Sequence, residues 1–171
     1  RPQPQHLPGA MAGDDFRLNE VLRMVLDTMQ KALGARRIVF CLRDPRTDCL
    51  TGRFGLGEDV DRVCKAFKVP LDALGAKGVD LFGAICRKGA DTLIADATSG
   101  TVGSRLPPWF RQEVGAPWFL LLPLTTRNAP FGLIYADAAR PNAITLGEKE
   151  LSLLKTLRNQ AVMAFRQAER H

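Results

Sequence analysis

Two short apolar segments each end at an aspartate, a side chain that could act in acid–base catalysis or bind a metal ion. LIADA spans 93–97 and LIYADA spans 133–138, so Asp96 and Asp137 each follow a strand-like segment. A general acid and base pair would need converging geometry and a substrate pocket, and nothing in the spacing requires either. A metal site would need more ligands, and Asp91 is the only close addition. We therefore expect both aspartates to be turn residues that accept backbone N–H bonds where each strand ends.

The cysteines are the second set with chemical potential. They stand at 41, 49, 64 and 86, and no two of them form a CxxC pair. A structural zinc site needs ligands clustered in twos, so we expect no metal. No secretory signal precedes them, which favours reduced thiols in the cytosol. Cys64 and Cys86 fall on predicted helices among apolar neighbours, where thiols are usually inert, and Cys49, beside a turn, is expected to be the most exposed.

Size and composition indicate one ordinary water-soluble domain. The chain has 171 residues, of which 46% are hydrophobic and 25% charged. Its longest apolar run, at 118–124, is far shorter than the roughly 20 residues that span a bilayer. The net charge is +6, but the basic residues are spread along the chain and mixed with acids. The mixed charges argue against a nucleic-acid partner, and the short apolar run argues against a membrane-spanning segment.

The first residues differ in composition from the rest. RPQPQHLPGAMAGDD has three prolines in its first eight residues and little apolar content. Such a segment is typical of a linker, so we assign residues 1–14 to a linker and residues 15–171 to one domain. We expect the chain to be part of a longer, multidomain polypeptide.

Apolar spacing and turn residues predict an alternation of helices and hairpins. A helix capped by Asp15 and ended by Gly34 comes first, and the last helix is expected to begin with a Thr145/Glu148 capping box. A loop with one helical turn around Trp109 and Phe110 precedes the second hairpin. The other predicted elements are a hairpin at 36–55, helices at 58–68 and 79–89, a strand at 92–97 and a hairpin at 118–137. This order predicts an α+β fold with an antiparallel sheet.

The ordered set of segments resembles the GAF family of small-molecule sensor domains. The resemblance lies in the helix ending at Gly34 and in three stretches: GAICRKGADTLIADA at 83–97, APWFLLLPLTTRNAPFGLIYAD at 116–137 and TLGEKELSLLKTLRNQAVMAF at 145–165. It implies a central antiparallel sheet of five to six strands flanked by helices, with the N- and C-terminal helices packed together on one face. VFCLRDPRTDCLTGRFGLG at 39–57 and ELSLLKTLRNQAVMAFRQ at 150–167 further look like the GAF region that follows an HDOD domain in some bacterial signalling proteins.

The resemblance also suggests where a small molecule would bind. Haem needs an axial histidine and a covalent bilin needs a Cys, typically with a neighbouring His, but the two histidines are His6 and His171, so we expect no such cofactor. In this family the ligand sits between the sheet and the loops and helices after the second strand. Aromatic rings and one cation there could clamp an anionic or planar ligand, or the rings could simply fill the core. The candidates are Phe54, Phe67, Phe82, Arg105, Trp109, Phe110, Trp118 and Tyr135.

The terminal helices offer a second candidate surface. In GAF proteins the first and last helices often pair with a second copy as a bundle, so we expect a homodimer; the alternative is that these positions face the chain's own sheet. The candidates are Leu18, Val21, Leu22, Val25, Leu153 and Met163.

Taken together, the residues and the resemblance predict a non-catalytic regulatory module of a bacterial cytosolic signalling protein. It would bind a small molecule or a partner and relay this through its terminal helices. One alternative is an enzyme like the thiol-dependent free methionine-sulfoxide reductases of the GAF family. Another is a degenerate GAF fold used only for dimerisation, which a pocket filled by its own aromatic rings would favour.

Overall fold

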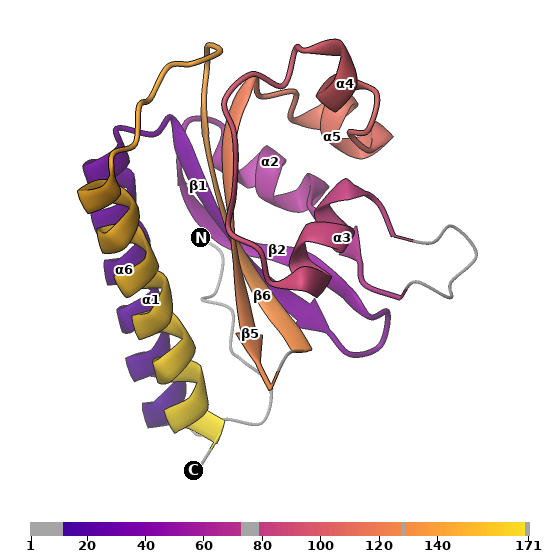
Figure 1. The fold of residues 1–171 in the computed structure, drawn as a ribbon. Helices are drawn as coiled ribbons and strands as arrows, with labels where there is room; N and C mark the ends of the chain where they lie inside the picture. The colour runs from indigo at the N-terminus through magenta and orange to yellow at the C-terminus, as the bar shows by residue number, and fades with distance from the viewer. Residues whose placement is uncertain (1–11, 73–78, 128, 170–171) are drawn as a thin grey trace.

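The computed structural model describes residues 12–72, 79–127 and 129–169, with side chains from Phe16 onward. Within these residues the fold is α+β, with one antiparallel sheet and helices on both of its faces (Figure 1). The helices are α1 (Ala12–Leu33), α2 (Val60–Ala66), α3 (Leu81–Lys88), α4 (Gly100–Gly103), α5 (Pro108–Glu113) and α6 (Glu148–Glu169). The strands are β1 (Arg37–Asp44), β2 (Cys49–Gly57), β3 (Lys68–Pro70), β4 (Thr92–Ile94), β5 (Trp118–Thr126) and β6 (Ala129–Ala138).

The six strands lie in the order β3-β2-β1-β6-β5-β4, and all neighbours are antiparallel. β1 and β6, which are far apart in the sequence, form the centre of the sheet, with Arg37 directly opposite Asp137. Successive side chains of a strand point to opposite faces. Each central strand therefore supplies two separate hydrophobic cores, one on either face of the sheet.

The first of these, which we call the helix-pair core, lies between the sheet and the two long helices α1 and α6. These helices run side by side along one face (Figure 1), as the resemblance to the GAF family implied. Ile38 and Phe40 reach it from β1, Leu22 and Met29 from α1, and Leu157 from α6, and all are at most 5% exposed. The 3.6-residue periodicity of both helices places their apolar side chains on this one face.

The second, which we call the aromatic core, lies on the other face, beneath α2, α3 and α5. Val39 and Cys41 enter it from β1, and Leu133 and Tyr135 enter it from β6. The short helix α3 is fixed over this face by Asp80, whose side chain accepts a hydrogen bond from the Gly83 N–H at 2.8 Å. Such an N-cap satisfies one of the free N–H groups at the start of a helix.

Two predicted helix starts differ from those observed. α1 begins at Ala12 rather than at Asp15, because an apolar repeat indicates which face of a helix is buried but not the residue at which the helix begins. At α6 the side chain of Glu150, not Glu148, reaches back and accepts from the Gly147 N–H at 2.9 Å. The predicted Thr145/Glu148 capping box is therefore wrong, and the helix starts at Glu148 behind Gly147.

None of the helices in the described part of the chain is both long enough and apolar enough to cross a membrane.

Candidate functional site

The aromatic core brings together five of the predicted pocket residues, four of them buried and the fifth, Trp109, half-buried. Phe67, Phe82, Phe110 and Tyr135 are each at most 2% exposed. The ring centroids of Phe67 and Tyr135 lie 4.7 Å apart, and those of Phe82 and Phe110 lie 5.0 Å apart. Phe119, which the sequence reading missed, stacks on Phe82 at 5.4 Å. These rings pack against one another as a protein core does, at distances typical of aromatic pairs.

Trp109 is the one ring of this group that is only half-buried. It lies on α5, with its ring 5.0 Å from Phe67 and 5.4 Å from Phe82. Its Nε1–H donates to Oδ2 of Asp80 at 3.4 Å, so it links α5 to the start of α3. Burial of Asp80 raises the pKa of that carboxyl above its usual value, against the opposing effect of its hydrogen bonds. Trp109 thus closes the outer side of the aromatic core.

The remaining pocket candidates do not join this cluster. Phe54 and Trp118 lie on the opposite face of the sheet, in the helix-pair core, where Trp118 Nε1–H donates to the Ile144 carbonyl at 3.1 Å. Arg105 is exposed between α4 and α5. The eight candidates therefore do not line one pocket. The period of two along β5 explains the error, because Trp118 and Phe119 must face opposite cores, and the ring on the aromatic side is Phe119.

Asp137 lies at the edge of the aromatic core and is fully buried. Its carboxylate accepts hydrogen bonds from Arg37 Nε at 2.9 Å, from Arg36 Nε at 3.4 Å and from the Tyr135 hydroxyl at 2.6 Å. Arg37 is itself only 3% exposed. Burial, followed by the neighbouring Asp137 charge, raises the pKa of Tyr135 well above its usual value, so the phenol stays a donor.

This network corrects the prediction that Asp137 is a turn residue. The residue lies inside β6, and its partners are two arginines and a tyrosine rather than backbone N–H groups of a turn. A buried charge needs a partner of opposite charge, and the arginines provide it. The Asp137 carboxylate is fully buried and already accepts hydrogen bonds from Arg36, Arg37 and Tyr135, so it is not positioned to act as a catalytic base.

Asp96 does behave as predicted. Its Oδ1 accepts from the backbone N–H of Thr98 at 2.9 Å and also from the Thr98 hydroxyl, which makes an Asx turn after β4. Asp91, in contrast, pairs with Arg158 of α6 through two bonds of 2.5 and 3.0 Å. The two aspartates of the opening motifs therefore have different surroundings and lie in no common site. Within the described residues no group of three or more His, Cys, Asp or Glu side chains could hold a metal ion.

Comparison with known proteins identifies the fold and the family. A family model for the GAF domain matches residues 17–166. This chain belongs to the GAF family. A search of curated proteins returned no match.

Solved structures show the same GAF fold. A GAF domain/HD domain protein from Geobacter sulfurreducens superposes with a TM-score of 0.69 at 17% identity, covering 90% of this chain and 95% of that one. A GAF domain of a phosphoenolpyruvate-protein phosphotransferase from Acinetobacter gives 0.60 at 15%, covering 93% and 96%. A free methionine-R-sulfoxide reductase from Neisseria meningitidis, in complex with its substrate, gives 0.63 at 16%, covering 98% and 99%. At these identities the likeness concerns the fold, which sensor domains and an enzyme share.

The thiols of this GAF domain are all buried. Cys49 is 6% exposed, so the expectation that it would be the most accessible is wrong, and its Sγ–H donates to the Thr47 carbonyl at 3.5 Å. Burial is the main cause that raises the pKa of Cys64 to about 11 and of Cys86 to about 12. Burial likewise raises the pKa of Cys41 well above its usual value. The reactive form of a cysteine is the thiolate, which these surroundings disfavour.

The terminal helices of the GAF domain divide the predicted dimer residues into two groups. Leu18, Leu22 and Val25 are at most 4% exposed and pack in the helix-pair core, so they cannot contact a second copy. On α6, Leu153 is 44% and Met163 52% exposed. Val21 of α1 and Met163 both line a groove of about 500 Å³, and the other lining residues, all on α6, are Thr156, Asn159, Gln160, Ala164 and Gln167.

The Asp137 network predicts a large difference between the two aspartates. Asp137→Asn should lower the free energy of unfolding by about 3 kcal/mol or more, because it leaves the buried Arg37 without its counter-charge. Asp96→Asn should change it by about 0.5 kcal/mol or less, because the position is near the surface and asparagine also forms Asx turns. Urea unfolding of both variants measures this. Equal effects would contradict the network.

The burial of the thiols predicts their reactivity and a pH dependence. A disulfide reagent at pH 8 should modify them only slowly in the folded protein, and all four of them quickly in urea. Because folding raises the pKa of Cys64 and Cys86, the stability they contribute is complete below the unfolded thiol value of 9.0 and is lost as pH rises towards 11 to 12. Urea unfolding from pH 8 upwards checks this. A thiol that reacts rapidly in the folded protein would contradict the burial of all four cysteines.

Proposed function

We propose that this GAF domain is a non-catalytic regulatory module that pairs with a second copy through α1 and α6 and transmits a signal as a small shift of these helices. The signal would come from a small molecule or from a protein partner. The observation that carries the proposal is a set of apolar side chains on the outer face of the helix pair. They are Phe16, 65% exposed, and Met24, 50%, on α1, and Leu153, 44%, and Met163, 52%, on α6.

These exposed side chains have no role in packing against the sheet, because both helices already bury a complete apolar face. α1 buries Leu22, Val25 and Met29, and α6 buries Leu154 and Leu157, so the sheet needs nothing more from either helix. Of the exposed apolar side chains, Met163 lies beside Val21 in one groove, and exposed apolar surface of this kind is typical of a contact with another protein. The groove between Val21 and Met163 gives this surface a concave part that can receive side chains from a partner.

A second copy is the occupant we propose for this surface. The two helices lie side by side, and an isologous contact between two such pairs makes a four-helix arrangement. The polar side chains that line the groove are uncharged: Thr156, Asn159, Gln160 and Gln167. Two identical surfaces of this kind can meet without like-charge repulsion between these groove residues.

The thiols support the non-catalytic part of the proposal. A reductase that forms a disulfide needs accessible thiolates, whereas Cys41 and Cys86 are fully buried and Cys49 and Cys64 are at most 8% exposed. The carboxylate of Asp137 is equally committed, to Arg36, Arg37 and Tyr135. Neither set of groups is presented to a substrate.

The packing of the aromatic core bears on the source of the signal. Phe67, Phe82, Phe110 and Tyr135 contact one another and are shielded from solvent, which supports a structural role for these rings. A module of this kind is regulated through its outer surfaces by a partner or a ligand held elsewhere, or it serves dimerisation alone. Trp109, half-buried and hydrogen-bonded to Asp80, is the predicted pocket residue best placed to meet a ligand at the rim.

The cellular setting belongs to the same proposal. The resemblance of residues 39–57 and 150–167 to GAF regions that follow an HDOD domain supports a bacterial, cytosolic signalling protein with an upstream HDOD domain. In such a chain the output would lie outside this domain. α1 and α6 would then carry the signal between domains.

Pairing through α6 predicts that one charge on its outer face separates the copies. The wild-type protein should sediment as a dimer, and Met163→Glu should weaken the dimer by roughly tenfold or more, because each contact then holds two desolvated carboxylates. Gln112→Glu on α5 is the matched control, since Gln112 is also exposed and the substitution also adds one carboxylate, but α5 lies on the opposite face of the sheet. Sedimentation equilibrium gives the dissociation constants.

Urea unfolding should show both variants folded, within about 0.5 kcal/mol of each other for the monomer, because both positions are at the surface. A wild-type monomer at high concentration, or a dimer that Met163→Glu leaves intact, would refute pairing through the helices.

A further inference from the structure

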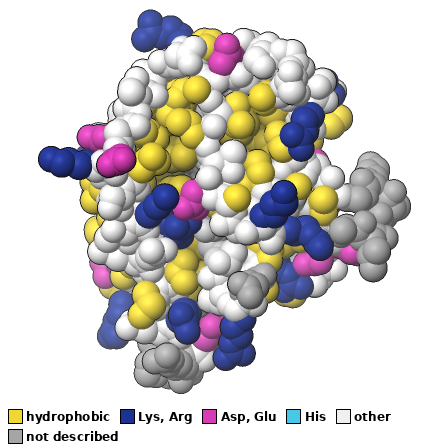
Figure 2. Space-filling view, viewed as in Figure 1, with side chains coloured by type: hydrophobic (Ala, Val, Ile, Leu, Met, Phe, Trp, Pro, Cys, Tyr) yellow, Lys and Arg dark blue, Asp and Glu magenta, His cyan; other side chains and the backbone are white. Residues whose placement is uncertain are grey.

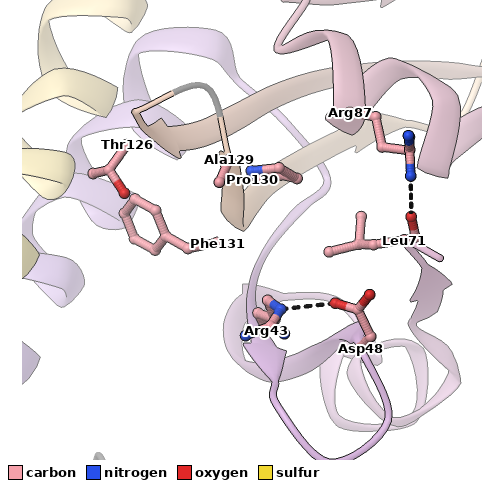
Figure 3. A pocket seen from close by; sticks show the side chains of 8 residues that line it. All are labelled: Arg43, Asp48, Leu71, Arg87, Thr126, Ala129, Pro130 and Phe131. Carbon is pink, nitrogen blue, oxygen red and sulfur yellow. Dashed lines mark hydrogen bonds and ion pairs between the residues drawn. The ribbon is translucent and has the colours of Figure 1, made fainter.

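A polar cavity lies at the end of the sheet where β5 turns into β6, separate from the aromatic core and from the helix groove. It has a volume of about 480 Å³ and lies between the β1–β2 hairpin, the end of α3 and the β5–β6 hairpin (Figure 3). Its polar walls are Arg43, Asp48, Arg87 and Thr126, and its apolar walls are Leu71, Ala129, Pro130 and Phe131.

Two arginines in this cavity retain most of their hydrogen-bonding capacity. Arg43 donates from Nε to Asp48 Oδ1 at 2.8 Å, and Arg87 donates from Nη1 to the Leu71 carbonyl at 2.7 Å (Figure 3). In the part of the chain that the structure describes, these are the only hydrogen bonds of either guanidinium. The other N–H groups have the fork geometry that matches a carboxylate or a phosphate.

The charge and polarity of the lining define the class of ligand. Arg43, Arg87 and Asp48 sum to a charge of +1, that is two positive charges and one negative. A monoanion would neutralise it. The walls made by Leu71, Pro130 and Phe131 would in turn cover an apolar group attached to that anion. A small organic carboxylate with an apolar body has both properties.

The surroundings of the cavity add to its attraction for anions. Lys and Arg side chains gather at the end of the molecule where α6 ends and β5 meets β6 (Figure 2). Arg127, Arg166 and Glu169 line a neighbouring cavity of about 350 Å³ with a net charge of +1, two positive and one negative, and Thr126 is shared between the two cavities. A concentration of positive charge raises the local concentration of anions and the rate at which they arrive.

One wall of the cavity connects it directly to α6. The pairing of β5 with β6 skips Phe131 at an irregularity between Leu124 and Thr125, and the Phe131 ring packs against Phe165 of α6 at a centroid distance of 5.3 Å. Phe165 in turn stacks on Phe40 of the helix-pair core at 5.8 Å. A ligand that contacts Phe131 therefore contacts the residue whose ring packs against Phe165 in the last turns of α6.

We propose that the cavity lined by Arg43, Arg87 and Phe131 binds a small organic carboxylate and that its occupancy steadies the end of α6 through the Phe131–Phe165 contact. Binding stands on the cavity alone, whereas the effect on α6 rests on the regulatory function proposed above. The site would let the module sense a metabolite without opening its aromatic core.

Benzoate is the probe for this site, with benzamide as its neutral counterpart of nearly the same shape. Benzoate added to the ¹⁵N-labelled protein should shift the amide signals of Arg43, Leu71, Arg87 and Phe131, and benzamide should not. Arg43→Gln and Arg87→Gln should each weaken benzoate binding by roughly tenfold, because each removes a charge-assisted hydrogen bond. Arg111→Gln, at an exposed arginine of α5 away from the cavity, is the control and should leave binding unchanged.

The relay is measured in the same samples by hydrogen exchange. Benzoate should slow exchange of the amides at 160–168, and it should not do so in Arg43→Gln at the same concentration. Absent shifts at the cavity, equal binding of benzamide, or inorganic phosphate binding as tightly as benzoate would overturn the site. Shifts without slower exchange in α6 would overturn the relay. The shifts at the cavity do not depend on dimerisation, and exchange is measured in Met163→Glu as well, where slower exchange cannot come from pairing, so this proposal and the dimer proposal fail separately.

Discussion

The pairing of β1 with β6 is the constraint on which the rest of the structure depends. The two strands are separated by most of the chain, yet their side chains supply both cores of the domain. At the end of this pair the buried Arg37 and Asp137 lie directly opposite each other, and their ion pair brings Arg36 and Tyr135 into one network. A shift of register by one residue would send the apolar side chains of the shifted strand to the wrong face and separate Arg37 from Asp137. The network thus specifies one pairing.

The two faces of the sheet consequently differ in what covers them and in what they expose. On one face, the ring of Phe67, directly after α2, and aromatic rings from α3, α5, β5 and β6 contact one another and make a closed core. On the other, α1 and α6 cover the sheet and keep apolar side chains such as Met24 and Met163 on their outer surface. Arg158, held by Asp91 and by the Pro123 carbonyl, fastens the middle of α6 to the edge of the sheet. The end of α6 instead packs through Phe165 on Phe131, which lines the polar cavity with Arg43 and Arg87. This end is therefore the part of the helix that a ligand in the cavity can influence.

Periodicity predicted the helices, the hairpins and the α+β class, because apolar spacing directly encodes which face of an element is buried. The packing of α1 beside α6 was implied by the resemblance to the GAF family. The candidate site was harder to predict. The local sequence does not distinguish Trp118 from Phe119, because only the side chain on the aromatic face can meet Phe82 and that face is fixed by pairing with β6. Asp137 resembles Asp96 in its local sequence, and nothing local indicates that Arg36 and Arg37, one hundred residues earlier, meet its carboxylate. The polar cavity lined by Arg43, Arg87 and Phe131 is formed by segments from four parts of the chain, so only the tertiary structure reveals it.

The central claim is that two copies of this GAF domain meet through their terminal helices, and the distance between copies tests it most directly. The buried native thiols favour spin labelling at an introduced cysteine, either Ser152→Cys on α6 or Arg111→Cys on α5, on the other face of the sheet. Dipolar coupling measured by pulsed electron paramagnetic resonance then reports the separation of the two labels. The account predicts a defined distance between the labels at position 152 that is shorter than that between the labels at position 111. The absence of coupling at position 152, or a shorter distance at position 111, would contradict it.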